Sequence, residues 1–180
     1  SFTQTTTDPG NDSHSYVWSV SKNGSAFTTG AGVQFGFTPD DNGTYVVSVV
    51  CTDQDNAHSN PATATVNVVN ANPTATLTAP TSDQLRNSVV AFSGTVADPS
   101  AADTFNATWD FGDGSPIEST SKVYTYKAFT RTHTYAAAGT YTVTLTVQDD
   151  DGGSNTKTAQ DLIFSSGVMP GRVLRAPRGE

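Results

Sequence analysis

The chain contains one pattern twice, and this repetition constrains its fold more than any other feature. Trp18 precedes Gly43-Thr44-Tyr45, and Trp109 precedes Gly139-Thr140-Tyr141. A shift of 96 residues superposes the two Gly-Thr-Tyr runs and places Val66 on Leu162, while a shift of 90 to 91 residues superposes the tryptophan segments. Self-similarity at such a period indicates copies of one structural unit. We therefore expect two domains of one kind, each near the lower size limit for a single hydrophobic core.

Each unit is predicted to consist of β-strands. From Tyr141 to Val147 the odd-numbered residues are apolar and threonines lie between them, which is the period of a half-buried strand. Tyr45 to Cys51 occupies the same place in the first unit. The sequence has 29 Thr but only five Leu and two Glu, and Thr favours strands over helices. The predicted fold class is therefore all-β.

The order of these landmarks favours two tandem immunoglobulin-like β-sandwiches. A tryptophan on the third strand and a tyrosine opening the sixth strand are typical of that fold. In the first unit Val47 occupies the place of the second cysteine of the immunoglobulin disulfide. Cys51 is the one cysteine, so these 180 residues form no disulfide among themselves. Trp18 and Trp109 are then expected to fill the space between the sheets.

We expect a first sandwich over residues 1–69, a short linker over 70–73, a second sandwich over 74–166 and a disordered tail over 167–180. The strand expected at 74–78 has no counterpart in the first unit, because Ser1 already corresponds to Ala91. The first sandwich is therefore predicted to lack its N-terminal strand. The remaining expected strands are 2–6, 15–20, 34–38, 44–52, 63–69, 89–96, 105–111, 121–127, 129–135, 140–148 and 156–165.

The acidic residues indicate which kinds of partner to expect. Of 17 acidic residues 15 are Asp, which favours turns and offers oxygen ligands. Residues 1–166 carry 16 acidic against six basic residues, a formal charge of −10, and this argues against nucleic acid as a partner. No stretch approaches the roughly 18 apolar residues of a membrane span, so we expect no membrane insertion of this segment.

Three runs of the second unit carry a family resemblance. They are Trp109-Asp110-Phe111-Gly112-Asp113-Gly114, then His133-Thr134-Tyr135 ahead of Gly139-Thr140-Tyr141, and Asp149-Asp150-Asp151-Gly152-Gly153. Together they resemble a PKD (polycystic kidney disease) domain, and the first unit resembles a divergent relative. The resemblance implies an extracellular β-sandwich without catalytic activity, secreted or on the cell surface. Such domains occur in tandem in surface proteins, or beside secreted proteases and polysaccharide hydrolases.

The resemblance also implies a calcium site. Some collagenase-associated PKD domains bind calcium through the linker, an aspartate beside the tryptophan, and the aspartate run after the sixth strand. Carried over to this sequence, the ligands are Asn70, Asp110, Asp149 and Asp150. Thr108 stands where those domains have a further aspartate, so one carboxylate of the pattern is absent.

The expected topology points to calcium independently, because Ca²⁺ takes six to eight oxygen ligands from loops. In an immunoglobulin-like sandwich the loops after the second and sixth strands share one end with the first residues of the domain. An ion at that end of the second unit would also stiffen the joint between the units. The alternative is that these aspartates only form turns. The residues gathered there would be Asn70, Asn72, Asp98, Asp103 and Asp149 to Asp151, and in the first unit Asp8, Asp12, Asp53 and Asp55.

Catalysis has little support in the sequence. His14 and His58 lie in expected loops, and His133 is expected to pack or hydrogen-bond within the fold. No catalytic triad order, zinc spacing or phosphate-binding loop is present. Asp113-Gly114 is expected to form the turn after the third strand. We predict a non-enzymatic module.

Tyr124 and Tyr126 form a second candidate site, because both lie on one face of an expected strand. Aromatic rings so placed could stack on a sugar or on a protein partner. The alternative is an edge strand whose Lys122 and Lys127 discourage aggregation. The sequence thus predicts a spacer that stiffens a larger secreted or surface protein and contacts its neighbouring domains. It leaves open a module that recognises polysaccharide or fibrous protein for an attached hydrolase, and an adhesion module.

Overall fold

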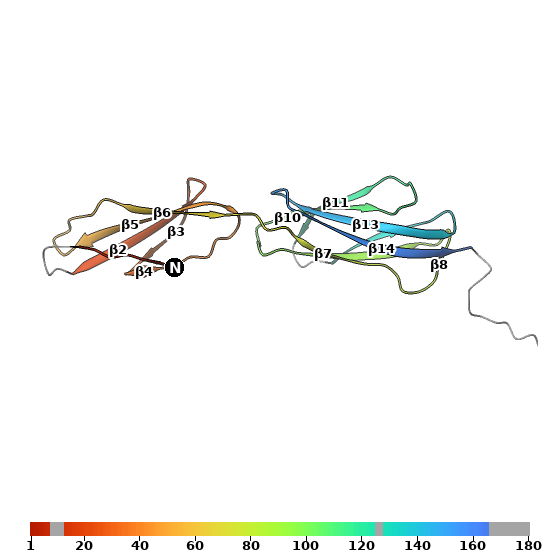
Figure 1. Ribbon diagram of the computed structural model, residues 1–180, viewed down its shortest axis with the longest axis horizontal. Coiled ribbons are helices and arrows are strands. Elements are labelled where there is room, and N and C mark those ends of the chain that lie inside the picture. The colour runs from red at the N-terminus through yellow and green to blue at the C-terminus, as the bar shows by residue number, and fades with distance from the viewer. Residues whose placement is uncertain (8–12, 125–127, 166–180) are drawn as a thin grey trace, which may run out of the picture. The chain divides into compact units, whose positions relative to one another are not determined.

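A computed structural model describes residues 1–7, 13–124 and 128–165, and every regular element in these ranges is a β-strand. The chain divides into two compact units, Ser1–Asn70 and Ala71–Glu180, which Figure 1 shows in order along the chain. The all-β prediction is confirmed. The predicted tail at 167–180 lies outside the described residues.

The second unit is a sandwich of two antiparallel sheets with one added parallel edge strand (Figure 1). Its core lies between the sheets, where Phe92 of one sheet and Trp109 and Leu145 of the other are almost fully buried. The first sheet has the order β11(Glu118–Tyr124)-β10(Thr104–Asp110)-β13(Gly139–Asp149)-β14(Ser154–Phe164)-β8(Gln84–Leu85), and the second has the order β12(Ala128–His133)-β9(Val90–Ala97)-β7(Thr74–Thr78).

The first unit has one full sheet and a short strand pair. The sheet has the order β3(Ser25–Ala31)-β2(His14–Lys22)-β5(Gly43–Asp53)-β6(Ala62–Val68), and β1(Phe2–Thr3) pairs with β4(Gln34–Phe35). Trp18 is 3% exposed and stacks on Phe35 with ring centroids 5.7 Å apart. Tyr45 is fully buried beside Phe27 and Phe37. Aromatic side chains therefore supply much of this core.

A tyrosine closes the same corner in both units. The hydroxyl of Tyr45 donates a hydrogen bond of 2.8 Å to the carbonyl of Asp41, and the hydroxyl of Tyr141 donates one of 3.1 Å to the carbonyl of Ala137. Each acceptor lies four residues upstream of its tyrosine. This is the tyrosine corner of immunoglobulin-like sandwiches, so both units share that fold and the repeat is structural.

The predicted shift of 96 residues misaligns the last strands of the two units by one residue. Tyr45 pairs with Val66, whereas the matching Tyr141 pairs with Asp161. Val66 therefore corresponds to Asp161 and not to Leu162. Because a shift of one residue reverses the faces of a strand, Asp161 points inward and is 4% exposed, while Leu162 is 50% exposed.

Two strands were not predicted. Ser25–Ala31 forms β3, which follows the Asn23-Gly24 turn as the second arm of a hairpin with β2. Gln84–Leu85 forms β8, a short parallel partner of the end of β14. The strand predicted at 34–38, by contrast, is shorter than expected and covers only Gln34–Phe35. Positive φ angles of 51° at Asn23 and 84° at Gly24 form the turn between β2 and β3, and Asn-Gly accepts such angles readily.

Candidate metal centre

Three buried aspartates meet at one end of the second unit. Asp98 follows β9, Asp103 directly precedes β10, and Asp149 ends β13. Each offers a carboxylate oxygen within 4.8 Å of those of the other two. Their exposed fractions are only 4%, 3% and 4%. The topology alone predicted that these loops would share an end, and the three side chains do converge there.

Local turns fix two of these carboxylates. Oδ1 of Asp98 accepts a hydrogen bond of 2.9 Å from the backbone N–H of Ser100. Oδ1 of Asp149 accepts two, of 3.0 Å from Asp151 and 2.6 Å from Gly153. Aspartate side chains commonly bind the backbone two residues on in this way. Oδ2 of Asp98 is buried and has no hydrogen-bond partner within the described part of the chain.

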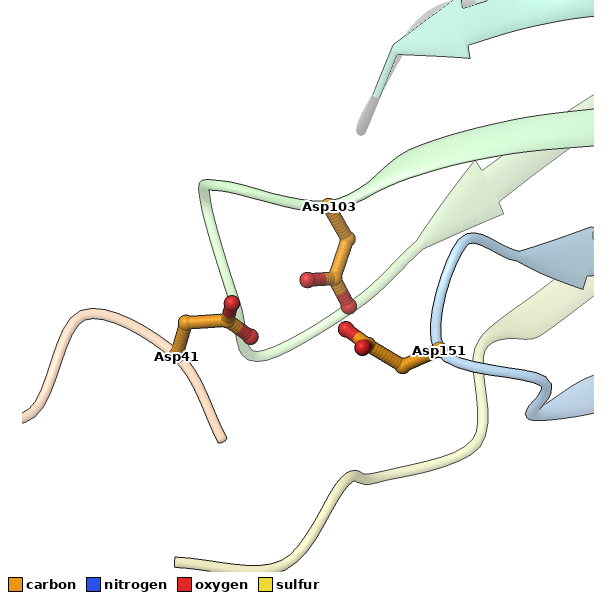
Figure 2. Close-up of side chains that lie close together, drawn as sticks. All are labelled: Asp41, Asp103 and Asp151. Atoms are coloured by element: carbon orange, nitrogen blue, oxygen red, sulfur yellow. The ribbon is translucent and has the colours of Figure 1, made fainter. Parts of the chain in front are cut away.

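Asp151 adds a fourth carboxylate from the turn between β13 and β14. Figure 2 shows the side chains of Asp103 and Asp151 facing each other, and their carboxylate oxygens lie within 4.8 Å. Asp151 is exposed, unlike the three buried aspartates. Figure 2 also draws Asp41, which belongs to the first unit and forms an ion pair with Lys22 there.

This arrangement has the dimensions of a calcium site. Two oxygens that bind one Ca²⁺ at 2.3–2.6 Å lie at most about 5 Å apart, so the 4.8 Å limit allows all three buried carboxylates to reach one ion. Buried carboxylates lose hydration and repel one another, and a divalent cation offsets both costs. The unpartnered Oδ2 of Asp98 is an acceptor that such an ion would satisfy. The residues therefore fit calcium.

Comparison with known proteins identifies the family. A family model described as "PKD domain" matches residues 70–163, which is more than half of the 180-residue chain. The chain belongs to the PKD family. The second unit is thus a PKD domain, a type of module that is typically non-catalytic and is found in extracellular or secreted proteins.

Three solved structures are similar to this chain. The PKD domain of an M14-like peptidase from Thermoplasmatales archaeon SCGC AB-540-F20 is 20% identical, with 53% of this chain and 98% of that chain covered and a TM-score of 0.48. The PKD1 domain of Vibrio anguillarum Epp is 28% identical, with coverages of 53% and 96% and a TM-score of 0.38. Fibronectin(III)-like modules of Clostridium thermocellum CbhA are 17% identical, with coverages of 97% and 87% and a TM-score of 0.43.

No curated protein matches the chain. Among the described residues, no helix could span a membrane.

Asp110 of the PKD domain does not join the buried aspartates, so this part of the carried-over ligand set is wrong. Phe105 pairs with Asp149 at one end of β10, and Asp110 pairs with Thr144 at the other end. Five residues along a strand separate the two ends by about 17 Å. Oδ1 of Asp110 instead accepts a hydrogen bond of 2.9 Å from the N–H of Gly112. Asp110 therefore shapes the turn after β10.

Asp150 has a different role from its neighbours. Its Oδ1 accepts a hydrogen bond of 2.9 Å from the backbone N–H of Thr104, the first residue of β10. The side chain thus ties the turn after β13 to the start of β10, beside Asp103. Asn70 ends the first unit, and its part in metal binding stays a prediction.

The equivalent end of the first unit is described only in part. Oδ1 of Asp53 accepts hydrogen bonds of 2.9 Å from the N–H groups of Asp55 and Ala57, and Asp55 itself is exposed. Asp8 and Asp12 lie outside the described residues. Turn formation therefore accounts for these hydrogen bonds of Asp53, and a metal site in this unit stays a prediction.

His133 of the PKD domain is part of a packed network. It stacks on Phe111 with ring centroids 4.2 Å apart, and its Nε2 lies 2.8 Å from Oδ2 of Asp113. Burial alone would raise the pKa of Asp113, but hydrogen bonds from Ser115 and His133 lower it to about 2. The predicted packing and hydrogen bonding of His133 are therefore present.

The predicted site at Tyr124 and Tyr126 lies partly outside the described residues. The structure gives the backbone of Tyr124 at the end of β11, and Tyr126 lies outside the described residues. A ligand-binding role of Tyr124 and Tyr126 stays a prediction.

Proposed function

We propose that this PKD chain is a non-catalytic spacer of a secreted or cell-surface protein, and that its second unit binds one calcium ion through Asp98, Asp103 and Asp149. The observation that carries the calcium proposal is the group of three buried carboxylates within 4.8 Å of one another. The spacer role is supported by family membership and by the presence of two immunoglobulin-like units in one short chain.

Calcium would hold together two loops that are far apart in sequence. Asp98 and Asp103 bracket the connection between β9 and β10, and Asp149 begins the turn between β13 and β14. A shared ion would join these loops at the end where the hydrogen bond from Thr104 to Asp150 already links them. Because the unfolded chain does not bring these ligands together, the ion would bind the folded state and stabilise it.

Thermal unfolding in EDTA, in calcium and in magnesium tests this proposal. A ligand that binds only the folded state contributes about 2.7 kcal/mol at a hundredfold excess over its Kd. In a domain of this size each kcal/mol raises the midpoint by about 4–8 °C, so the full effect is a rise of about 11–22 °C. We expect such a rise with calcium and a much smaller one with magnesium, which demands a tighter octahedral geometry.

Two isosteric variants locate the ion. Asp103→Asn should abolish the calcium-dependent rise, because Asp103 belongs to the buried group. Asp83→Asn is the matched control, since Asp83 is an exposed aspartate of the same unit near β8, at the other end of β14. An unchanged midpoint in calcium, or an equal loss in both variants, would contradict the proposed site.

A further inference from the structure

The pairing of β10 with β13 ends beside the buried aspartates. The last backbone pair of this ladder joins Phe105 to Asp149. One residue further along β10, the backbone N–H of Thr104 donates a hydrogen bond of 2.9 Å to Oδ1 of Asp150. A side chain of the turn after β13 thus continues the link between the two strands at the point where their backbone pairing ends.

This hydrogen bond joins the immediate neighbours of two candidate calcium ligands. Asp103 directly precedes Thr104, and Asp149 directly precedes Asp150. The carboxylate oxygens of Asp103 and Asp149 lie within 4.8 Å of each other, although the two residues come from strands that are far apart in sequence. The ends of a strand ladder open at a low free-energy cost. Without the hydrogen bond, the start of β10 could therefore move away from the turn after β13.

Asp150 does not belong to the group of carboxylates that can share one ion. Among the described residues, the close groups of acidic side chains do not include it. Asp150 is exposed, whereas Asp149 is 4% exposed, and the hydrogen bond from Thr104 directs Oδ1 of Asp150 to the backbone of β10. These contacts suit a residue that orients metal ligands rather than one that binds the ion.

We propose that Asp150 is a positioning residue of the calcium site. Its hydrogen bond holds the start of β10, and with it Asp103, at the distance from Asp149 that one shared ion requires. This inference rests on the proposed function, in which the three buried aspartates bind calcium. The buried Oδ2 of Asp98, which has no hydrogen-bond partner within the residues described, supports a cation at this place. Removing a group that orients metal ligands typically lowers metal affinity about 10- to 100-fold.

Two substitutions separate the hydrogen bond of Asp150 from its charge. Asp150→Asn keeps a side-chain oxygen that can accept the hydrogen bond from Thr104, and Asp150→Ala removes it. Both variants lose the same negative charge, so the difference between them isolates the hydrogen bond. We expect Asp150→Ala to bind calcium at least about tenfold more weakly than Asp150→Asn does.

Calorimetric titration of calcium into the 180-residue chain, below the unfolding midpoint of every variant, measures these affinities. Asp110→Ala is the matched control. Asp110 is also exposed, and its Oδ1 accepts a hydrogen bond of 2.9 Å from the N–H of Gly112. It lies about 17 Å from the Asp149 end of β10, which exceeds the screening length of about 8–10 Å at physiological salt. The calcium affinity of Asp110→Ala should therefore be unchanged.

Hydrogen exchange at the amide of Thr104 gives a readout that needs no calcium. In EDTA we expect exchange to be at least about tenfold faster in Asp150→Ala than in the unchanged chain, and to be slow again in Asp150→Asn. Equal exchange in the two variants, or equal calcium affinities in them while the unchanged chain binds calcium, would overturn the positioning role and leave the calcium site standing. Absence of calcium binding by the unchanged chain would overturn both.

Discussion

The sixth strand of each unit ends in the same aspartate turn, but the two aspartates lie in different surroundings. Asp53 accepts hydrogen bonds from the N–H groups two and four residues on, and so does Asp149. Asp53 is half-buried, whereas Asp149 is 4% exposed beside Asp98 and Asp103. Turn formation explains why aspartate stands at both positions, and only burial among other carboxylates distinguishes a candidate metal ligand from a turn residue.

The two cores differ in a related way. Val66 and Asp161 occupy matching positions on the last strands, yet one is apolar and the other carries a buried carboxyl whose Oδ2 has no hydrogen-bond partner within the described residues. The first unit fills its core with stacked aromatic rings, and the second unit with side chains of two opposed sheets. One fold therefore tolerates different core compositions as long as the tryptophan and the tyrosine corner remain.

The largest effect is expected from the tryptophans. Trp18→Ala and Trp109→Ala should each cost about 3–5 kcal/mol, because each removes the large side chain at the centre of its own core. Denaturant unfolding followed by far-ultraviolet circular dichroism measures the loss. The remaining tryptophan reports the other unit by fluorescence and should show an unchanged midpoint. A matching shift in the other unit would contradict the division into two units.

An intermediate effect is expected at Gly112. A β-carbon there would collide with the carbonyl of Thr142, and φ is +75°. Gly112→Ala should therefore destabilise the second unit by about 2–3 kcal/mol. Gly24→Ala in the first unit is the matched control, since φ is +84° but the added carbon meets no described residue within 4 Å beyond the two neighbours of Gly24 in the chain. That variant should cost only about 1 kcal/mol, the left-handed penalty alone. Equal losses of stability in Gly112→Ala and Gly24→Ala would show that the backbone near Thr142 moves to relieve the collision, and would contradict this prediction.

The smallest effect is expected from replacing Asp161 by valine, the residue type that Val66 supplies at the matching position of the first unit. Burial raises the pKa of Asp161, and a hydrogen bond from the backbone N–H of Leu162 offsets part of that rise. Asp161→Val should therefore stabilise the second unit by about 1–3 kcal/mol at neutral pH. The folded state holds the proton of the Asp161 carboxyl more tightly than the unfolded state does. The stability of the second unit is therefore not reduced by Asp161 below pH 3.8, and it falls as pH rises through the folded pKa.

The gain from Asp161→Val should accordingly be small near pH 3.5 and grow toward pH 7. Urea unfolding of both proteins at several pH values measures it. The reciprocal Val66→Asp should destabilise the first unit, with the loss growing in the same direction. A gain that is independent of pH would mean that the pKa of Asp161 is the same in the folded and unfolded states, and would contradict the raised pKa.

Much of the fold could be predicted from the sequence because its signals are local. Alternation from Tyr141 to Val147 and the paired Gly-Thr-Tyr runs identify strands and the tyrosine corner directly. The segment Ser25–Ala31 was missed because it contains few large apolar residues and shows no alternation. The shift between Val66 and Leu162 was wrong because hydrophobicity alone cannot fix the register of a strand to within one residue.

The candidate site could be predicted only where topology determines it. Asp98, Asp103 and Asp149 follow from which loops share an end of an immunoglobulin-like sandwich. Asp110 was included among the predicted calcium ligands because it stands beside Trp109 in the motif. It lies at the end of β10 that is about 17 Å from the end beside Asp149. The sequence likewise does not distinguish Asp150, which binds the backbone of Thr104, from Asp149.

Calorimetric titration of calcium into the chain tests the central claim most directly. We predict one ion bound to the second unit and lost in Asp98→Asn. That change removes charge from the buried carboxylate whose Oδ2 has no hydrogen-bond partner among the residues that the structure describes. Asp110→Asn should bind as the unchanged chain does. Absence of any calcium binding, or its loss in Asp110→Asn while Asp98→Asn still binds, would contradict the account.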